Sequence, residues 1–119
     1  MKIKDMQKLL DAKVVCCEEN IERQVYSACG CDLMSDVLAY VKDQAVLLTG
    51  LVNPQVIRTA EMMDMICIVF VRSKTPSDEI IQMAKEHGIV IMCTEKRLYE
   101  ACGILYSNGL IGSATKAQS

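Results

Sequence analysis

The chain has 119 residues, of which 51% are hydrophobic and 24% charged, and its formal net charge is -2 at pH 7. This length predicts one domain, because a single domain usually takes about 100–200 residues. Lysine and arginine are scattered without forming a basic stripe, which argues against a nucleic-acid partner. No apolar run approaches the roughly 18 residues of a membrane helix, and the first residues lack the apolar segment of a signal peptide. We therefore expect a cytoplasmic protein with no membrane partner.

Hydrophobic spacing along the chain predicts alternating helices and strands. Apolar residues three or four positions apart are typical of amphipathic helices, and short apolar runs between turn residues are typical of strands. In chain order we expect a helix over 3–10, strands over 13–17 and 24–29, a helix over 33–42, a strand over 45–49, a helix over 54–64, a strand over 66–72, a helix between Thr75 and Gly88, a strand over 89–93 and a helix after Thr94. The domain is expected to span residues 1–108, and the Gly- and Ser-rich residues 109–119 to form a flexible tail.

Four residues stand where a helix N-cap would accept backbone N–H groups. They are Asp32, Asn53, Thr75 and Thr94, and Asn53 is followed by Pro54, which suits a first helical position. Gly88 is typical of a residue that ends a helix. For the helix after Asp32, the spacing predicts an inward face made of Leu33, Val37, Leu38 and Val41.

From residue 45 onward, three successive strand–turn–helix units predict the fold. Their strands are almost wholly apolar, as expected when both faces of a sheet are covered. Right-handed crossovers between such units give an α/β domain with a mainly parallel sheet flanked by helices. The turns at residues 50–53, 72–75 and 93–94 would then meet at the carboxyl edge of the sheet, where open α/β sheets bind ligands.

Polar residues at these turns are candidates for binding a small anion, because helix N-termini present free N–H groups. Arg72 and Lys74 are the cations of this set, although a solvated charged turn is the alternative for both. Capping alone would explain Asn53 and Thr75, and Asp36 is equally compatible with a surface charge near a helix start. The candidate ligand-binding residues are Thr49, Gly50, Asn53, Arg72, Ser73, Lys74, Thr75, Thr94, Ser35 and Asp36.

Seven cysteines are many for a chain without a signal peptide, and the odd number argues against a disulfide scaffold. Cys67, Cys93 and Cys102 are predicted to pack as small apolar residues. Cys29 and Cys31 could bind zinc or an iron–sulfur cluster, yet no second pair of thiols or imidazoles completes a set of four ligands. His87, the only histidine, stands in a last helical turn, so a Cys–His catalytic pair is not indicated. We expect no cofactor and no catalytic residues.

Nearly the whole chain resembles the DRTGG domain family, which is similar to the N-terminal domain of HPr kinase/phosphorylase. The resemblance rests on the order and spacing of "VVCCEENIERQV", "CDLMSDVLAYV", "VLLTG" and "TPSDEIIQMAKEHGIVIMCTEKRLYEACGILY". It implies an α/β regulatory or accessory domain, often attached to CBS domains or phosphotransacetylase-type proteins, with no established catalytic activity. The signature residues are not retained. This chain has "TGLVNPQ" in place of the Asp-Arg stretch and "VRSKTPS" in place of the Thr-Gly-Gly stretch.

The sequence is compatible with three functions. The first is a non-enzymatic regulatory homodimer that binds a small anionic, nucleotide-like ligand at the strand ends. The second is an interaction module without a ligand, which docks a signalling or hydrogenase-related protein through an exposed Met-rich surface that includes Met34, Met62, Met63 and Met65. The third is a thiol-metal or redox protein that uses Cys29 and Cys31, although no nucleophile, base and orienting group are visibly assembled.

Overall fold

The computed structural model describes residues 1–40 and 44–112 as one α/β domain. Its helices are α1 (Ile3–Leu10), α2 (Met34–Tyr40), α3 (Pro54–Met62), α4 (Asp78–His87) and α5 (Leu98–Ser107), and a short 3-10 helix covers Glu18–Asn20. Its strands are β1 (Lys13–Cys16), β2 (Ser27–Gly30), β3 (Ala45–Thr49), β4 (Cys67–Phe70) and β5 (Val90–Cys93).

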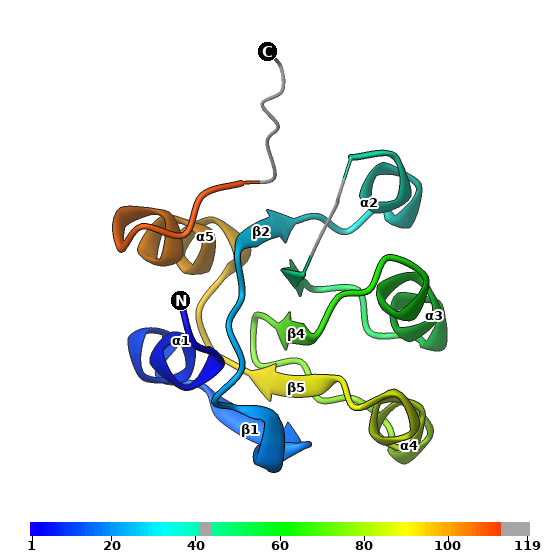
Figure 1. Cartoon of the computed structure of the whole chain (residues 1–119). Coiled ribbons are helices and arrows are strands. Elements are labelled where there is room, and N and C mark those ends of the chain that lie inside the picture. Colours follow the sequence, from blue (N-terminus) through cyan, green and yellow to red (C-terminus); the bar gives the residue numbers. More distant parts are fainter. Residues whose placement is uncertain (41–43, 113–119) are drawn as a thin grey trace.

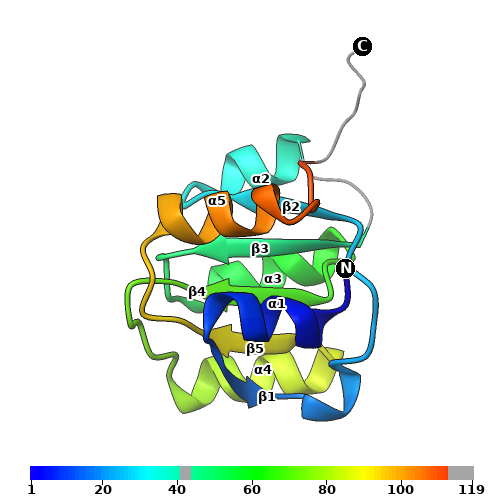
Figure 2. The same cartoon turned by 90° about the vertical axis from the view of Figure 1, so that its left-hand side faces the viewer.

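The five strands form one sheet in the order β1-β5-β4-β3-β2. Strands β2 to β5 are parallel to their neighbours, and only β1 is antiparallel, on β5. Helices α2, α3 and α4 cover one face of the sheet, and α1 and α5 cover the other (Figures 1 and 2). The predicted mainly parallel sheet with helices on both sides is confirmed.

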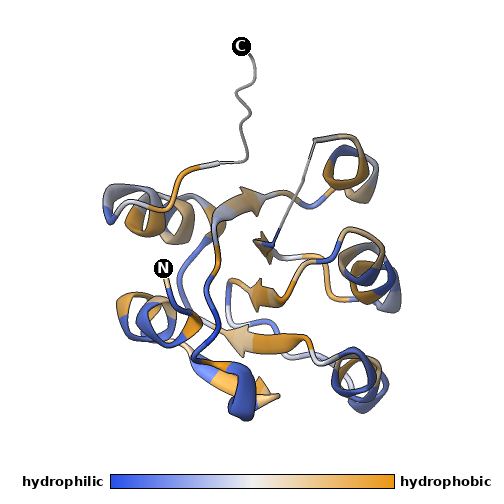
Figure 3. Ribbon diagram, in the orientation of Figure 1, coloured by the Kyte–Doolittle hydropathy of each residue, from blue (hydrophilic) through white to orange (hydrophobic). Residues whose placement is uncertain are grey.

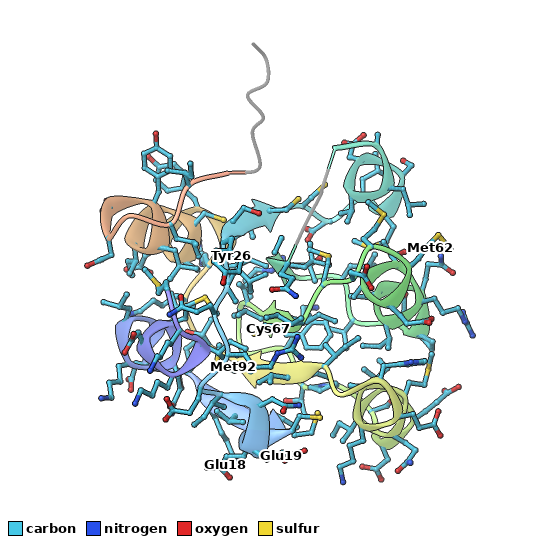
Figure 4. All side chains as sticks on the ribbon, in the orientation of Figure 1. Glu18, Glu19, Tyr26, Met62, Cys67 and Met92 are labelled. Carbon is cyan, nitrogen blue, oxygen red and sulfur yellow. The ribbon has the colours of Figure 1, made fainter. Side chains whose placement is uncertain are left out.

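The core lies on both faces of the central strands. Every residue of β3 and β4 has an exposed fraction of 0%, and these strands are strongly hydrophobic in Figure 3. Cys67 and Met92 lie inside the molecule, whereas Met62 projects outward from α3 (Figure 4). The core position predicted for Cys67 is therefore confirmed. In the described residues, no helix is long and apolar enough to cross a membrane.

Two predicted helix ends are confirmed by their hydrogen bonds and dihedral angles. The Asn53 side chain accepts a hydrogen bond from the Gln55 backbone N–H at 2.9 Å, and Pro54 opens α3. Gly88 ends α4 in the left-handed conformation, with φ of 68°. Glycine suits this position because it has no Cβ to clash there.

Three of the other sequence expectations about helices are wrong. Helix α4 begins at Asp78 rather than near Thr75, because Ser77 is the cap and accepts a hydrogen bond from Ile80 N–H at 3.3 Å. Helix α5 begins after Arg97, so Thr94 does not cap it. On α2, Val37 is buried but Leu38 is 41% exposed, and Leu33, which precedes the helix, is 58% exposed. Val41 lies outside the described residues.

The chain after α5 returns to the edge strand β2. Leu110 is buried, and the Ala28 N–H donates a hydrogen bond to the Ile111 carbonyl at 3.0 Å. Part of the stretch expected to be a tail is therefore packed on the domain. The remaining residues, 113–119, lie outside the described part of the chain.

Candidate functional site

The carboxyl ends of four parallel strands meet at one edge of the sheet, which is on the left in Figure 2. Asp32 follows β2, Gly50 follows β3, Arg72 and Ser73 follow β4, and Glu95 follows β5. Parallel pairing brings these turns together although they are widely separated in sequence. The predicted convergence of the turns at this edge is thus present in the structure.

Asp32 joins the end of β2 to the end of β3. One carboxylate oxygen of Asp32 accepts hydrogen bonds from the Thr49 hydroxyl at 2.9 Å and from the Gly50 N–H at 2.8 Å. The Thr49 hydroxyl oxygen in turn accepts a hydrogen bond from Leu51 N–H at 3.1 Å. Asp32 therefore holds the turn after β3 instead of capping α2. This role of Asp32 was not predicted from the sequence, although its position two residues after a strand indicates a place at the edge of the sheet.

The Arg72 side chain crosses from the end of β4 to the turn after β3. Its guanidinium group lies so close to Gly50 that a Cβ there would be 3.0 Å from both Cζ and Nε of Arg72. Any larger residue at position 50 would therefore displace the guanidinium group. Within the described residues, none of the ion pairs involves Arg72. Its positive charge consequently remains available to an anionic ligand.

The backbone of the Arg72–Ser73 turn is left-handed at two successive residues, with φ of 60° and 59°. Residues other than glycine rarely adopt this conformation. The turn is held by hydrogen bonds from Arg72 N–H to the Lys96 carbonyl at 2.9 Å and from Ser73 N–H to the Thr94 carbonyl at 3.0 Å. Because both N–H groups are occupied, a ligand would meet the side chains of this turn rather than its amides.

Four side chains line a shallow hollow of about 540 Å³ at this edge: Arg72, Ser73, Glu95 and Arg97. Two guanidinium groups and one carboxylate leave the hollow with an excess of positive charge. Arg72 and Ser73 were predicted from the sequence as binding residues, whereas Glu95 and Arg97 were not. Glu95 and Arg97 were not considered as binding residues because α5 was predicted to begin directly after Thr94, which would place both residues inside the helix.

The other candidate residues have different surroundings. The Thr94 side chain is buried and donates a hydrogen bond to the Leu10 carbonyl at 2.8 Å, so its hydroxyl supports α1. Asn53 is occupied as the cap of α3. Lys74 and Thr75 are exposed in the segment that leads to α4, and Ser35 and Asp36 are exposed on the first turn of α2.

The Cys29 thiol near this edge is protonated at neutral pH. Burial, together with the neighbouring Cys31, Cys102 and Asp36, raises the pKa of Cys29 to about 11. The Cys31 sulfur accepts a hydrogen bond from Leu33 N–H at 3.3 Å. A protonated thiol is a poor nucleophile and a poor metal ligand. Among the described residues, no three or more Cys, His, Asp or Glu side chains are grouped to hold a metal ion.

A larger hollow, of about 880 Å³, lies at the opposite edge, among the segments that lead into the parallel strands. His87 lines it, and its Nδ1 lies 4.0 Å from a carboxylate oxygen of Glu61. The charges of this hollow are mixed, since Arg23 lines it together with Glu61 and Asp64. Gln44, next to residues that the structure does not describe, also lines it. The carboxyl edge, with its excess of cations, is therefore the better candidate for an anion.

Residues 5–107, nearly the whole described chain, match the DRTGG domain family. The chain belongs to this family. A solved structure of the CBS and DRTGG domains from the regulatory region of Clostridium perfringens pyrophosphatase has a similar fold, with a TM-score of 0.72 and 17% sequence identity. The match covers 87% of this chain and 45% of that chain, so this DRTGG domain spans less than half of the solved protein. That protein was crystallised with its activator, diadenosine tetraphosphate. No curated protein matches the sequence.

Proposed function

We propose that this DRTGG domain is a non-enzymatic regulatory module that works as a homodimer and binds a small anionic, nucleotide-like ligand at the carboxyl edge of its sheet. The observation that carries the proposal is the Arg72 guanidinium group, which lies against Gly50 and, among the residues that the structure describes, forms no ion pair with a carboxylate. Arginine forms paired hydrogen bonds with phosphate groups, and its charge is permanent.

The surroundings of Arg72 support a ligand that contains phosphate. Arg97 adds a second guanidinium group, and the Ser73 hydroxyl can donate a hydrogen bond to a phosphate oxygen. Glu95 can accept a hydrogen bond from a hydroxyl group, which favours a ligand that carries both phosphate and sugar. The polyphosphate activator of the related pyrophosphatase region is of the same chemical class.

Thermal unfolding in the presence of nucleotides, dinucleoside polyphosphates, acyl-CoA compounds and inorganic phosphate tests the proposal. A ligand held at about 100 times its Kd adds roughly 2.7 kcal/mol to the stability of the folded protein, which raises Tm clearly. Arg72→Ala should weaken binding about tenfold or more, because a hydrogen bond to a charged group contributes about 1.5–3 kcal/mol. Arg58→Ala, an exposed arginine on α3, is the matched control and should bind normally. If no compound raises Tm, or if Arg72→Ala retains the full shift, the proposal fails.

An interaction module without a ligand is the second candidate. The Met-rich surface predicted from the sequence does not support this function. Met34 and Met65 are buried, with exposed fractions of 7% and 2%, and of the four methionines only Met62 is largely exposed. A different observation favours docking: Tyr99 and Tyr106 on α5 are 92% and 68% exposed. A chain that binds no small molecule but associates through these tyrosines would fit this second function.

A further inference from the structure

Helix α5 is apolar on both of its sides. Ala101 and Leu105 face the sheet and are fully or almost fully buried, whereas Tyr99 and Tyr106 point away and are largely exposed. Glu100 is the only charged residue within α5, whereas α4 contains Asp78, Glu79, Lys85 and Glu86. A helix that is hydrophobic all round is normally covered on every side. The outer side of α5 therefore has the character of an interface.

The outer side of α5 carries two protruding tyrosine side chains, with a glycine between them. Gly103 lies four residues after Tyr99 and three before Tyr106, so the three positions share one side of the helix. Apart from its two chain neighbours and the nearby backbone of α5, no atom lies within 4 Å of the place where a Cβ of Gly103 would stand. A hollow of about 630 Å³ is lined by α5 and Asn108, including both tyrosines, Cys102 and Gly103. The rings of Tyr99 and Tyr106 stand on either side of Gly103, which has no side chain. Another helix can therefore pack closely against this surface.

We propose that this outer side of α5 is the surface on which a second copy of the chain docks, with the two α5 helices antiparallel and crossing at Gly103. A two-fold interface requires a surface that is complementary to itself. In the antiparallel arrangement, Tyr99 of one copy meets Tyr106 of the other, and aromatic pairs of this kind are favourable. The homodimer is part of the proposed function, and this inference specifies its interface.

Charge on the helix selects the antiparallel arrangement. Glu100 lies three residues, or about 4.5 Å, before Gly103, so the two Glu100 carboxylates would stand about 9 Å apart along the axis. Each carboxylate would then lie near Ser107 of the other copy, whose hydroxyl can donate a hydrogen bond. The opposed helix dipoles add a further favourable contribution. A parallel crossing would instead align the two helix dipoles unfavourably.

The size of the surface indicates a reversible dimer. A helix of ten residues is about 15 Å long and by itself covers less than the roughly 800 Å² per partner of a standard interface. Helix α1 lies beside α5 on the same face of the sheet (Figure 2). Its exposed Asp5 and Lys8 provide charges of both signs, as is usual at the rim of an interface. We expect a dimer that dissociates on dilution.

Sedimentation velocity over a wide range of protein concentration, without ligand, tests this surface. The wild-type chain should shift from monomer to dimer, and Tyr99→Glu and Tyr106→Glu should each raise the dimer Kd tenfold or more. Gly103→Leu, which fills the opening with a good helix former, should do the same without loss of folding. Tyr26→Glu, at a tyrosine 64% exposed outside α5, is the matched control and should leave the Kd unchanged. Circular dichroism confirms that each variant is folded.

A wild-type chain that stays monomeric at every concentration would overturn the inference, and so would a dimer that the α5 variants leave intact. Arg72→Ala should dimerise normally, because Arg72 lies outside this surface. A ligand that raises the Tm of wild type but not of Arg72→Ala would therefore support the binding site even if the α5 interface failed. Dimerisation lost in the tyrosine variants alone would support the interface even if no ligand bound.

Discussion

Ser73 occupies a backbone conformation that suits glycine, with φ of 59° directly after the φ of 60° at Arg72. A left-handed residue other than glycine costs about 1–2 kcal/mol, and part of this is recovered in the greater freedom of glycine in the unfolded chain. Ser73→Gly should therefore raise the free energy of unfolding by about 0.5–1 kcal/mol, measured by urea denaturation. Gln82→Gly, in the middle of α4, should instead lower it by about 1 kcal/mol. A Ser73→Gly variant no more stable than wild type would show that the turn carries no strain.

The same turn explains which site residues could be found from the sequence. Arg72 and Ser73 were identifiable because they follow a strongly hydrophobic strand, but neither residue type signals a left-handed backbone. The family resemblance places Thr-Gly-Gly in this stretch, and the two left-handed residues adopt a conformation that glycine favours. Thr94 was assigned by local pattern as a cap and ligand residue. Its actual partner, the Leu10 carbonyl, lies 84 residues away in the sequence.

At the scale of the elements, Asp32 connects the ends of β2 and β3 through two hydrogen bonds to one carboxylate oxygen. Asp32→Ala leaves the Thr49 hydroxyl and the Gly50 N–H without this partner, which should cost about 1–3 kcal/mol of stability in thermal or urea unfolding. Asp32→Asn retains an acceptor oxygen and should lose less. Asp36→Asn, an exposed carboxylate on α2, serves as the control and should change stability by less than about 1 kcal/mol. Equal stabilities of Asp32→Ala and wild type would exclude a structural role for this carboxylate.

The strands were more predictable than the helix starts for a physical reason. Strands β3 and β4 are buried on both faces, so a continuous apolar run is enough to identify them. Helix starts depend on which of several nearby polar residues caps, and around α4 the structure selects Ser77 over Thr75. The antiparallel pairing of β1 with β5 brings together residues such as Lys13 and Cys93, and no local pattern encodes such a distant pairing.

Across the whole molecule, buried thiols link stability to alkaline pH. Burial is the main cause that raises the pKa of Cys17 and of Cys29 to about 11, and it also raises the pKa of Cys67. In the unfolded chain these thiols ionise near their ordinary value of about 9. Between pH 9 and 11 the unfolded chain thus binds fewer protons than the folded one, so the free energy of unfolding falls as pH rises, and below pH 9 the thiols have no such effect.

Replacing the thiols isolates this contribution from that of the lysines and tyrosines, which also titrate in alkali. In urea unfolding under reducing conditions, a Cys17→Ala/Cys29→Ala variant should lose stability less steeply than wild type from pH 9 to 11. Below pH 9 the two curves should run parallel, offset by the packing lost with the two sulfur atoms. Gln55→Ala, an exposed position on α3 without a titratable group, should follow the wild-type slope throughout. Parallel curves for wild type and the double variant above pH 9 would mean that Cys17 and Cys29 ionise as readily in the folded chain as in the unfolded one.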